Sequence, residues 1–386
     1  MKRKPYSQAI GKLIQCLLFI LLLPVVKTQS AQALPAKPQS DFFRGARWAL
    51  DTGSRTQTHD ASSLKMMNFA GFDFYSDLYF GGKHRGDLVA QVYLFDMRTL
   101  SADESERNAR FDYAPCVIAP NIILLPQGRL NLKIGHMWHA YGLRNQINTT
   151  QTLRQMISQD NMGLMLDWGA ELHGELSIFT YNVSLGSGSG KWFSRANDTY
   201  MGVARLGIHG DYPALGNLPV QVGFSGLSAR IQSPQGLIER WRAGADLQYE
   251  GPIGILLEGS LGEDESIATS YGDPREALSL FAEIHWKSST ENWMIYFQQR
   301  YLSLTLEPQA FEIPADAMLE LEAGQQGMLS LNPMMESSIL EITDRQESST
   351  FGVLHTPFRS FYVAGEVVLR SGTESSMARL QIRYRW

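Results

Sequence analysis

The chain has 386 residues, of which 44% are hydrophobic and 19% are charged, and its formal net charge is −5. Its two cysteines exclude the disulfide framework of a small secreted domain, because one of them, Cys16, lies in the N-terminal leader described below. The acidic balance excludes the basic face that nucleic-acid binding requires, so no nucleic-acid partner is expected.

The N-terminus predicts a cleaved secretory signal peptide. Three consecutive basic residues precede an apolar run at 16–26, and Ala31 and Ala33 provide the small residues of a cleavage site. The apolar run of about 11 residues is too short to span a bilayer as a helix, which disfavours the alternative of a membrane anchor. We therefore expect a signal peptide at 1–33 and a single domain at 34–386. The leader holds five of the 34 Lys and Arg and no acid, so 29 cations face 39 acids in the domain and its net charge is −10.

The domain alternates apolar and polar residues with a period of two, which is typical of strands with two different faces. The clearest segments are "LMLDWGAEL" (164–172), "LPVQVGFSG" (218–226), "RWRAGADLQYE" (240–250) and "LSLFAEIHW" (278–286). These strands are about 9 to 13 residues long, which suits tilted strands that cross a bilayer. Aromatic residues such as Trp286 and Tyr249 lie near strand ends, as in the aromatic girdles of membrane barrels. A secreted, soluble β-rich protein is the alternative.

The connections after residue 164 alternate between short and long, as they do in outer-membrane barrels. The expected short turns are 173–175, 211–217, 250–252 and 288–291, and the expected long loops are 186–198, 229–239, 263–275 and 305–336. Before residue 160 two interpretations stay open: a strand near Val117–Leu125, or a loop that folds into the barrel, with a short helix at 148–158. We predict an all-β fold, a transmembrane antiparallel β-barrel of about 16 strands, with 14 to 18 possible. A barrel of this size usually encloses an aqueous channel.

The last residues, "LQIRYRW", predict the closing strand of such a barrel. An arginine facing the bilayer midplane costs about 2–4 kcal/mol, so the arginines must face water and the alternate residues lipid. The lipid-facing set also resembles the C-terminal aromatic signal by which the barrel-assembly machinery recognises outer-membrane proteins. This predicted assembly signal consists of Leu380, Ile382, Tyr384 and Trp386.

Three segments resemble the phosphate-selective porin-like family of outer-membrane porins. They are "GRLNLKIGHMWHAYGLRN" (128–145), "NMGLMLDWGAEL…YNVSLGSGSG" (161–190) and "ERWRAGADLQYEGPIGILLEGSLGED" (239–264). The resemblance implies a 16-stranded homotrimeric porin in the outer membrane of a Gram-negative bacterium, in contact with lipid and lipopolysaccharide. The proline that the family places in its "GHMWHAYGL" segment is missing here.

Strand parity predicts the residues that line the pore. They are Lys133, Asp167, Glu171, Arg205, Arg242, Asp246, Glu250, Glu258, Arg379 and Arg383. The family carries ladders of basic residues for anions, whereas the predicted lumen face of this chain holds eight cations and seven anions. Such a balance gives no strong field for one ion, so the family's phosphate specificity is not expected. At the constriction we expect Lys133, Arg205, Arg242 and Arg379 to face Asp246, Glu171 and Glu258.

No catalytic residue, metal or cofactor is expected. None of the eight histidines lies in a hydrolase motif such as G-x-S-x-G. His136 and His139 are three residues apart, and on a strand or turn they point in different directions. The predicted function is passive diffusion of ions and small hydrophilic solutes. The alternative is a non-conducting barrel that acts as a receptor, adhesin or scaffold through long loops such as 305–336.

Overall fold

The computed structural model describes residues 43–59, 63–101, 108–145, 153–164, 166–190, 198–209, 219–233, 236–266, 275–305, 345–358, 360–371 and 376–386. The expected signal peptide lies outside these residues. So does the expected loop at 305–336, apart from its first residue.

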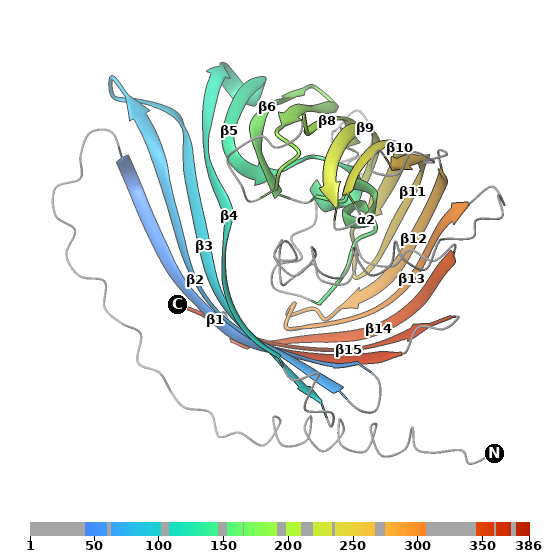
Figure 1. Ribbon diagram of the computed structural model, residues 1–386. Coiled ribbons are helices and arrows are strands. Elements are labelled where there is room, and N and C mark those ends of the chain that lie inside the picture. The colour runs from blue at the N-terminus through green and yellow to red at the C-terminus, as the bar shows by residue number, and fades with distance from the viewer. Residues whose placement is uncertain are drawn as a thin grey trace, which may run out of the picture. The chain divides into compact units, whose positions relative to one another are not determined.

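The described residues form sixteen strands in one closed antiparallel barrel, in which each strand pairs with its neighbours in sequence and β1 pairs with β16 (Figure 1). The strands are β1 (Phe43–His59), β2 (Ser63–Phe80), β3 (Lys83–Ser101), β4 (Asn108–Leu125), β5 (Leu130–Trp138), β6 (Leu166–Leu176), β7 (Phe179–Gly186), β8 (Tyr200–His209), β9 (Val220–Ser233), β10 (Gly236–Tyr249), β11 (Ile253–Ser266), β12 (Arg275–Lys287), β13 (Trp293–Thr305), β14 (Arg345–Phe358), β15 (Phe361–Arg370) and β16 (Met377–Arg385). The short helices are η2 (Pro126–Gly128), η3 (Gly142–Asn145) and α2 (Ser158–Met162). The prediction of an all-β barrel with 16 strands is confirmed.

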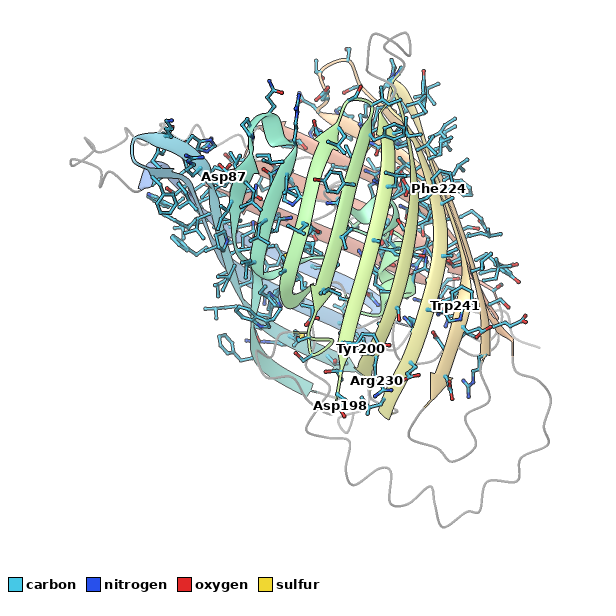
Figure 2. The ribbon with its side chains drawn as sticks, turned by 90° about the horizontal axis from the view of Figure 1, so that it is seen from above. Asp87, Asp198, Tyr200, Phe224, Arg230 and Trp241 are labelled. Atoms are coloured by element: carbon cyan, nitrogen blue, oxygen red, sulfur yellow. The ribbon has the colours of Figure 1, made fainter. Side chains whose placement is uncertain are left out.

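The period of two along each strand separates an apolar outer face from a polar inner face. On β12 the exposed side chains include Leu278, Leu280, Ile284 and Trp286, and the buried ones include Ser279, Phe281, Glu283 and His285. Phe224 and Trp241 project from the outer surface of their strands (Figure 2). An exposed apolar band that continues from strand to strand is the surface that a membrane barrel presents to hydrocarbon. None of the helices in the described ranges is long and apolar enough to cross a membrane.

The first four strands are longer than the expected 9 to 13 residues. They hold 17 to 19 residues each, whereas β5 to β16 hold 8 to 14. In the register Asp51 lies opposite Arg385, so residues 43–50 of β1 continue past the end of β16. There β1 pairs with β2, β2 with β3, and β3 with β4. We call this part of β1–β4 the extension.

Two expected connections are strand instead. Where a long loop is expected at 229–239, residues 229–233 belong to β9 and 236–239 to β10, and Ser233 pairs with Gly236. Arg230 lies opposite Glu239 and forms an ion pair with it, so opposite charges on neighbouring strands support the pairing. The turn expected at 173–175 also lies within β6, which ends at Leu176.

Both interpretations of the region before residue 160 prove correct. The stretch Val117–Leu125 belongs to strand β4, and the chain after β5 turns into the barrel. Figure 1 shows α2 inside the ring of strands, beside β10 and β11. The first part of the helix expected at 148–158 lies outside the described residues; residues 153–157 are not helical, and α2 begins at Ser158.

Candidate pore and inward segment

The chain between β5 and β6 forms what we call the inward segment, residues 139–145 and 153–164. Its anchor is Glu258 on β11, a carboxylate that is only 3% exposed. This carboxylate accepts hydrogen bonds from the Leu143 amide at 2.9 Å, from Ser158 Oγ at 2.6 Å and from Asn161 Nδ2 at 3.2 Å. Both η3 and α2 are thereby fixed to one side chain of the barrel wall.

A second anchor joins Arg154 of the inward segment to Glu283 on β12. Arg154 Nε donates to Glu283 Oε2 at 3.0 Å, and the second arm of the guanidinium pairs with Oε1. Gln298 donates to the same carboxylate at 2.7 Å, and His285 Nδ1 lies 2.9 Å from it. Breaking a buried ion pair of this kind leaves an uncompensated charge, which is strongly destabilising.

Two arginines of the wall also contact α2. Arg240 on β10 donates to the Asp160 carbonyl at 2.9 Å and makes two hydrogen bonds of 2.7 Å to Asp264. The Asp160 carboxylate pairs with Arg300 on β13. With Glu258 on β11 and Ser279 on β12, which donates to Asn161 at 2.8 Å, the polar groups of α2 contact side chains from four strands of the wall.

Apolar contacts complete this attachment. Leu143, Met156 and Ile157 pack with Leu256 and Phe281 in one buried cluster. In a second cluster the inward segment packs on the inner faces of β8 and β9; its members are Tyr141, Met162, Leu164, Met201, Val203, Leu227, Ala229 and Ile231. The inward segment therefore covers a part of the inner wall that presents both apolar side chains and the charged anchors Glu258 and Glu283.

The opposite side of the barrel carries a different group of side chains. Arg383 on β16 pairs with Asp51 on β1, and Tyr93 on β3 donates to the same carboxylate at 2.7 Å. Arg379 donates to Glu366 at 2.9 Å, and Arg385 pairs with Asp73 at 2.7 Å. Arg55 on β1 donates to its register partner Gln381 on β16 at 2.7 Å. We call Arg55, Arg379, Arg383 and Arg385 the arginine cluster.

The topology places the arginine cluster across the interior from the inward segment. In a closed ring of sixteen strands, the β1–β16 seam lies eight strands away from β8 and β9. The inward segment packs mainly on β8–β12. It also reaches β13, where Arg154 lies 6.0 Å from the Tyr296 ring, and Tyr296 donates to Glu366, the partner of Arg379, at 2.9 Å.

Most residues expected to line the pore are engaged with one another or with the wall. Lys133 donates to Glu171 at 2.8 Å, and Arg205 to Asp246 at 2.6 Å. Arg242 pairs with Asp264 at 2.7 Å, and Glu258 holds the inward segment. Arg379 and Arg383 lie on the seam, so Arg379 does not meet the acids on β6, β10 and β11 that it was expected to face.

Two of these residues support connections between strands. Asp167 accepts the amides of Gly188 at 2.6 Å and Gly190 at 3.0 Å, so it shapes the start of the loop after β7. Glu250, in the turn after β10, accepts from Lys287 Nζ at 2.6 Å and lies 3.8 Å from the His285 ring. These interactions lower the pKa of Glu250 to about 2, with His285 the larger cause and Lys287 the second, although partial burial opposes the shift.

The residues of the inward segment that make these contacts, chiefly Arg154, Asp160 and Asn161, were not predicted from the sequence. The roles of Asp51 and Glu366 as partners of Arg383 and Arg379 were not predicted either. The sequence of β12 does contain a signal for the inward segment, because Phe281 lies on the inner face between Ser279 and Glu283. A large apolar side chain on a water-facing surface indicates that another part of the chain covers it.

Comparisons with known proteins agree with this geometry. No protein-family model matches the sequence, and no curated protein matches it. Among solved structures, a loop-deletion mutant of OmpT, an outer membrane protein of Vibrio cholerae, has a TM-score of 0.57 at 10% identity and covers 88% of this chain and 99% of its own. Salmonella typhi OmpF in complex with daunomycin has a TM-score of 0.55 at 8% identity, covering 88% and 97%. The outer membrane channel DcaP of Acinetobacter baumannii has a TM-score of 0.51 at 9% identity, covering 88% and 97%. The chain has the fold of outer-membrane porins.

Proposed function

We propose that this protein is an outer-membrane channel through which ions and small hydrophilic solutes diffuse passively. The observation that carries the proposal is the asymmetric interior: the inward segment is fixed to one wall, and the arginine cluster lies on the other. Barrels of sixteen strands are wide enough to leave an aqueous interior beside such a segment. The porin fold of the structural neighbours supports this function.

Ion preference in this channel is weak. Of the ten residues predicted to line the pore, Glu258 is buried under the inward segment and Glu250 lies in a turn, so the proposal assigns the lining to the other eight. Most of their charges are neutralised by close partners. Three members of the arginine cluster are balanced in the same way by Asp51, Asp73 and Glu366, and the fourth, Arg55, donates to the neutral Gln381. Paired charges focus little field on a passing ion, so we do not propose selectivity for phosphate.

The remaining features of the proposal follow from the fold and the sequence. The protein is exported by its signal peptide and assembled into the outer membrane of a Gram-negative bacterium through its C-terminal strand. It contacts lipid and lipopolysaccharide, and it forms a homotrimer, as its resemblance to the phosphate-selective porin-like family implies. No enzymatic activity is part of the proposal.

The test is the conductance of refolded residues 34–386 in a planar bilayer under a KCl gradient. We expect stable open steps with a reversal potential close to zero. Arg385→Gln should move that potential toward cation preference, because Asp73 loses its partner, whereas Arg230→Gln at the distant rim serves as the matched control. If protein that is folded by heat-modifiable gel mobility gives no conductance steps, the channel function is overturned and a receptor, adhesin or scaffold is favoured.

A further inference from the structure

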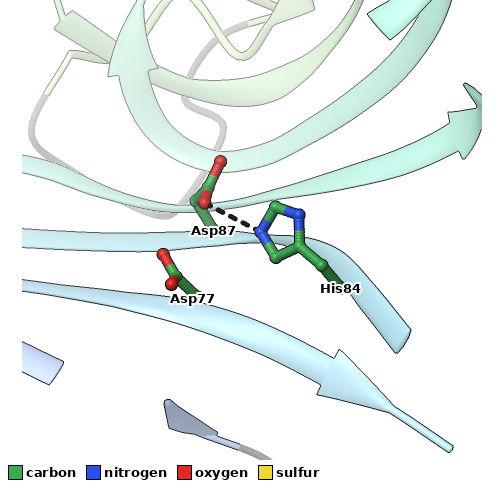
Figure 3. A group of neighbouring side chains, drawn as sticks. All are labelled: Asp77, His84 and Asp87. Atoms are coloured by element: carbon green, nitrogen blue, oxygen red, sulfur yellow. Dashed lines mark hydrogen bonds and ion pairs between the residues drawn. The ribbon is translucent and has the colours of Figure 1, made fainter. Parts of the chain in front are cut away.

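Three side chains that bind metals in other proteins meet on the extension. Asp77 lies near the end of β2, and His84 and Asp87 lie near the start of β3 (Figure 3). His84 Nε2 is 3.3 Å from Asp87 Oδ1, and one ligand atom from each of the three residues lies within 4.8 Å of the other two. Figure 2 places Asp87 at the end of the barrel opposite Asp198 and Arg230.

A β-bulge brings the imidazole to the two carboxylates. Residues three apart on a regular strand point to opposite faces, so His84 and Asp87 would be separated. In the register Leu78 pairs with Gly86 but Tyr79 pairs with His84, which leaves Arg85 as an extra residue on β3. The extra residue inverts the alternation and puts His84 on the face of Asp87. Bulges that re-aim a side chain are frequent next to functional sites.

The two carboxylates oppose each other directly. Asp77 and Asp87 are register partners on neighbouring strands, and like charges in that position destabilise a sheet. The porin function gives no reason for this pair, because it lies in the part of β2 and β3 that continues past the closing strand. A bound cation between the carboxylates would convert their repulsion into attraction.

Neighbouring residues fix the positions of two of these side chains. The Tyr79 ring lies 5.5 Å from the His84 ring at an angle of 55°, which restricts the imidazole. Gly45 lies at the register shift of β1 with a φ of +62°, and a Cβ there would come within 3.0 Å of Asp77 Oδ2. The Asp77 carboxylate therefore rests against glycine backbone, where a side chain on residue 45 would crowd it.

We propose that Asp77, His84 and Asp87 form a Zn²⁺ site on the β2–β3 hairpin, with water as the fourth ligand. Two ligands that each lie about 2.1 Å from a tetrahedral zinc are about 3.4 Å apart, which matches the contact between His84 and Asp87. Zinc is preferred over calcium and magnesium because the set contains an imidazole and only two carboxylates, whereas those ions favour all-oxygen sites. None of these three residues was predicted from the sequence to bind a metal.

The test is a calorimetric Zn²⁺ titration of refolded residues 34–386 in detergent. We expect one Zn²⁺ per chain, with affinity at least tenfold weaker in His84→Ala, Asp87→Asn and Asp77→Asn. Asp96→Asn is the matched control, because this carboxylate lies on the same strand but pairs with Arg98 away from the hairpin, and its variant should bind like the wild type. Heat-modifiable gel mobility shows whether each variant is folded.

A second readout identifies the coordination. Co²⁺ in a four-coordinate site has an intense visible absorption, which the folded wild type should show and which Zn²⁺ should remove. Equal Zn²⁺ affinity in the wild type and in folded His84→Ala would overturn the proposal. So would equal competition by Mg²⁺, which would mean that the carboxylates attract any divalent cation. Neither readout depends on conductance, so the zinc site and the channel can fail independently.

Discussion

The extension and the wall covered by the inward segment use charged residues in opposite ways. On the wall, Glu258 and Glu283 are buried, and each is held by several donors from the inward segment or from neighbouring strands. On the extension, Asp77 and Asp87 face each other at a half-exposed hairpin. Charges inside the barrel are thus committed to structure, whereas those on the extension are placed for a ligand from solution.

The largest expected effect comes from removing the buried ion pair of the inward segment. Arg154→Ala leaves Glu283 without its cation in a site from which water is excluded, so the free energy of unfolding should fall by about 3 kcal/mol. Urea unfolding in detergent measures this loss. Arg230→Ala breaks a pair whose side chains are 33% and 35% exposed and should change stability far less. Equal losses in the two variants would show that the inward segment is not held by Arg154.

The next effect separates the two faces of a single strand. Leu256 is fully buried under the inward segment, and Leu257 beside it is 43% exposed on the outer face. Leu256→Ala should cost about 3 kcal/mol, because it opens a cavity in addition to losing apolar contact. Leu257→Ala should cost less, because lipid or detergent can fill the space. Unfolding of both variants in the same detergent checks the order, and a larger cost for Leu257 would contradict it.

The smallest effect concerns the turn between β10 and β11. The pKa of Glu250 is lowered in the folded state to about 2, so its ionised form contributes stability above its ordinary pKa, and the contribution is lost as the pH falls toward 2. Glu250→Gln should lower the free energy of unfolding by less than about 1 kcal/mol at pH 6, because the group is half-exposed. The difference should shrink between about pH 4.5 and pH 2. A difference that is constant over this range would exclude the ionic contribution.

The fold could be predicted from sequence because alternation is a local property. On β10 and β16, Asp246, Arg242 and Arg383 fall on the inner parity without any knowledge of neighbouring strands. The length of β1–β4 could not be predicted, because a strand continues wherever a partner strand continues beside it. Residues 43–50 remain strand because β2 pairs with them.

The site was less predictable because its contacts join distant residues. Glu258 accepts hydrogen bonds from Ser158 and Asn161, which lie about 100 residues away in the chain, and no sequence pattern near Glu258 predicts those partners. The same holds for Arg154 and Glu283, which are 129 residues apart. The bulge at Arg85 could not be predicted for a different reason. Assigning faces from sequence assumes strict alternation along a strand, and one extra residue moves His84 to the other face.

The seam between β1 and β16 bears on how the barrel folds. Asp51 and Arg383 are 332 residues apart, and their ion pair and the bond from the Trp386 amide to the Leu50 carbonyl form only when the ends of the barrel meet. Contacts of such long range must repay the entropy of closing almost the whole chain, so we expect them late on the folding pathway. The ion pairs of the last strand therefore stabilise only the closed barrel. A chain that lacks its final residues would leave the edge of β1 unpaired.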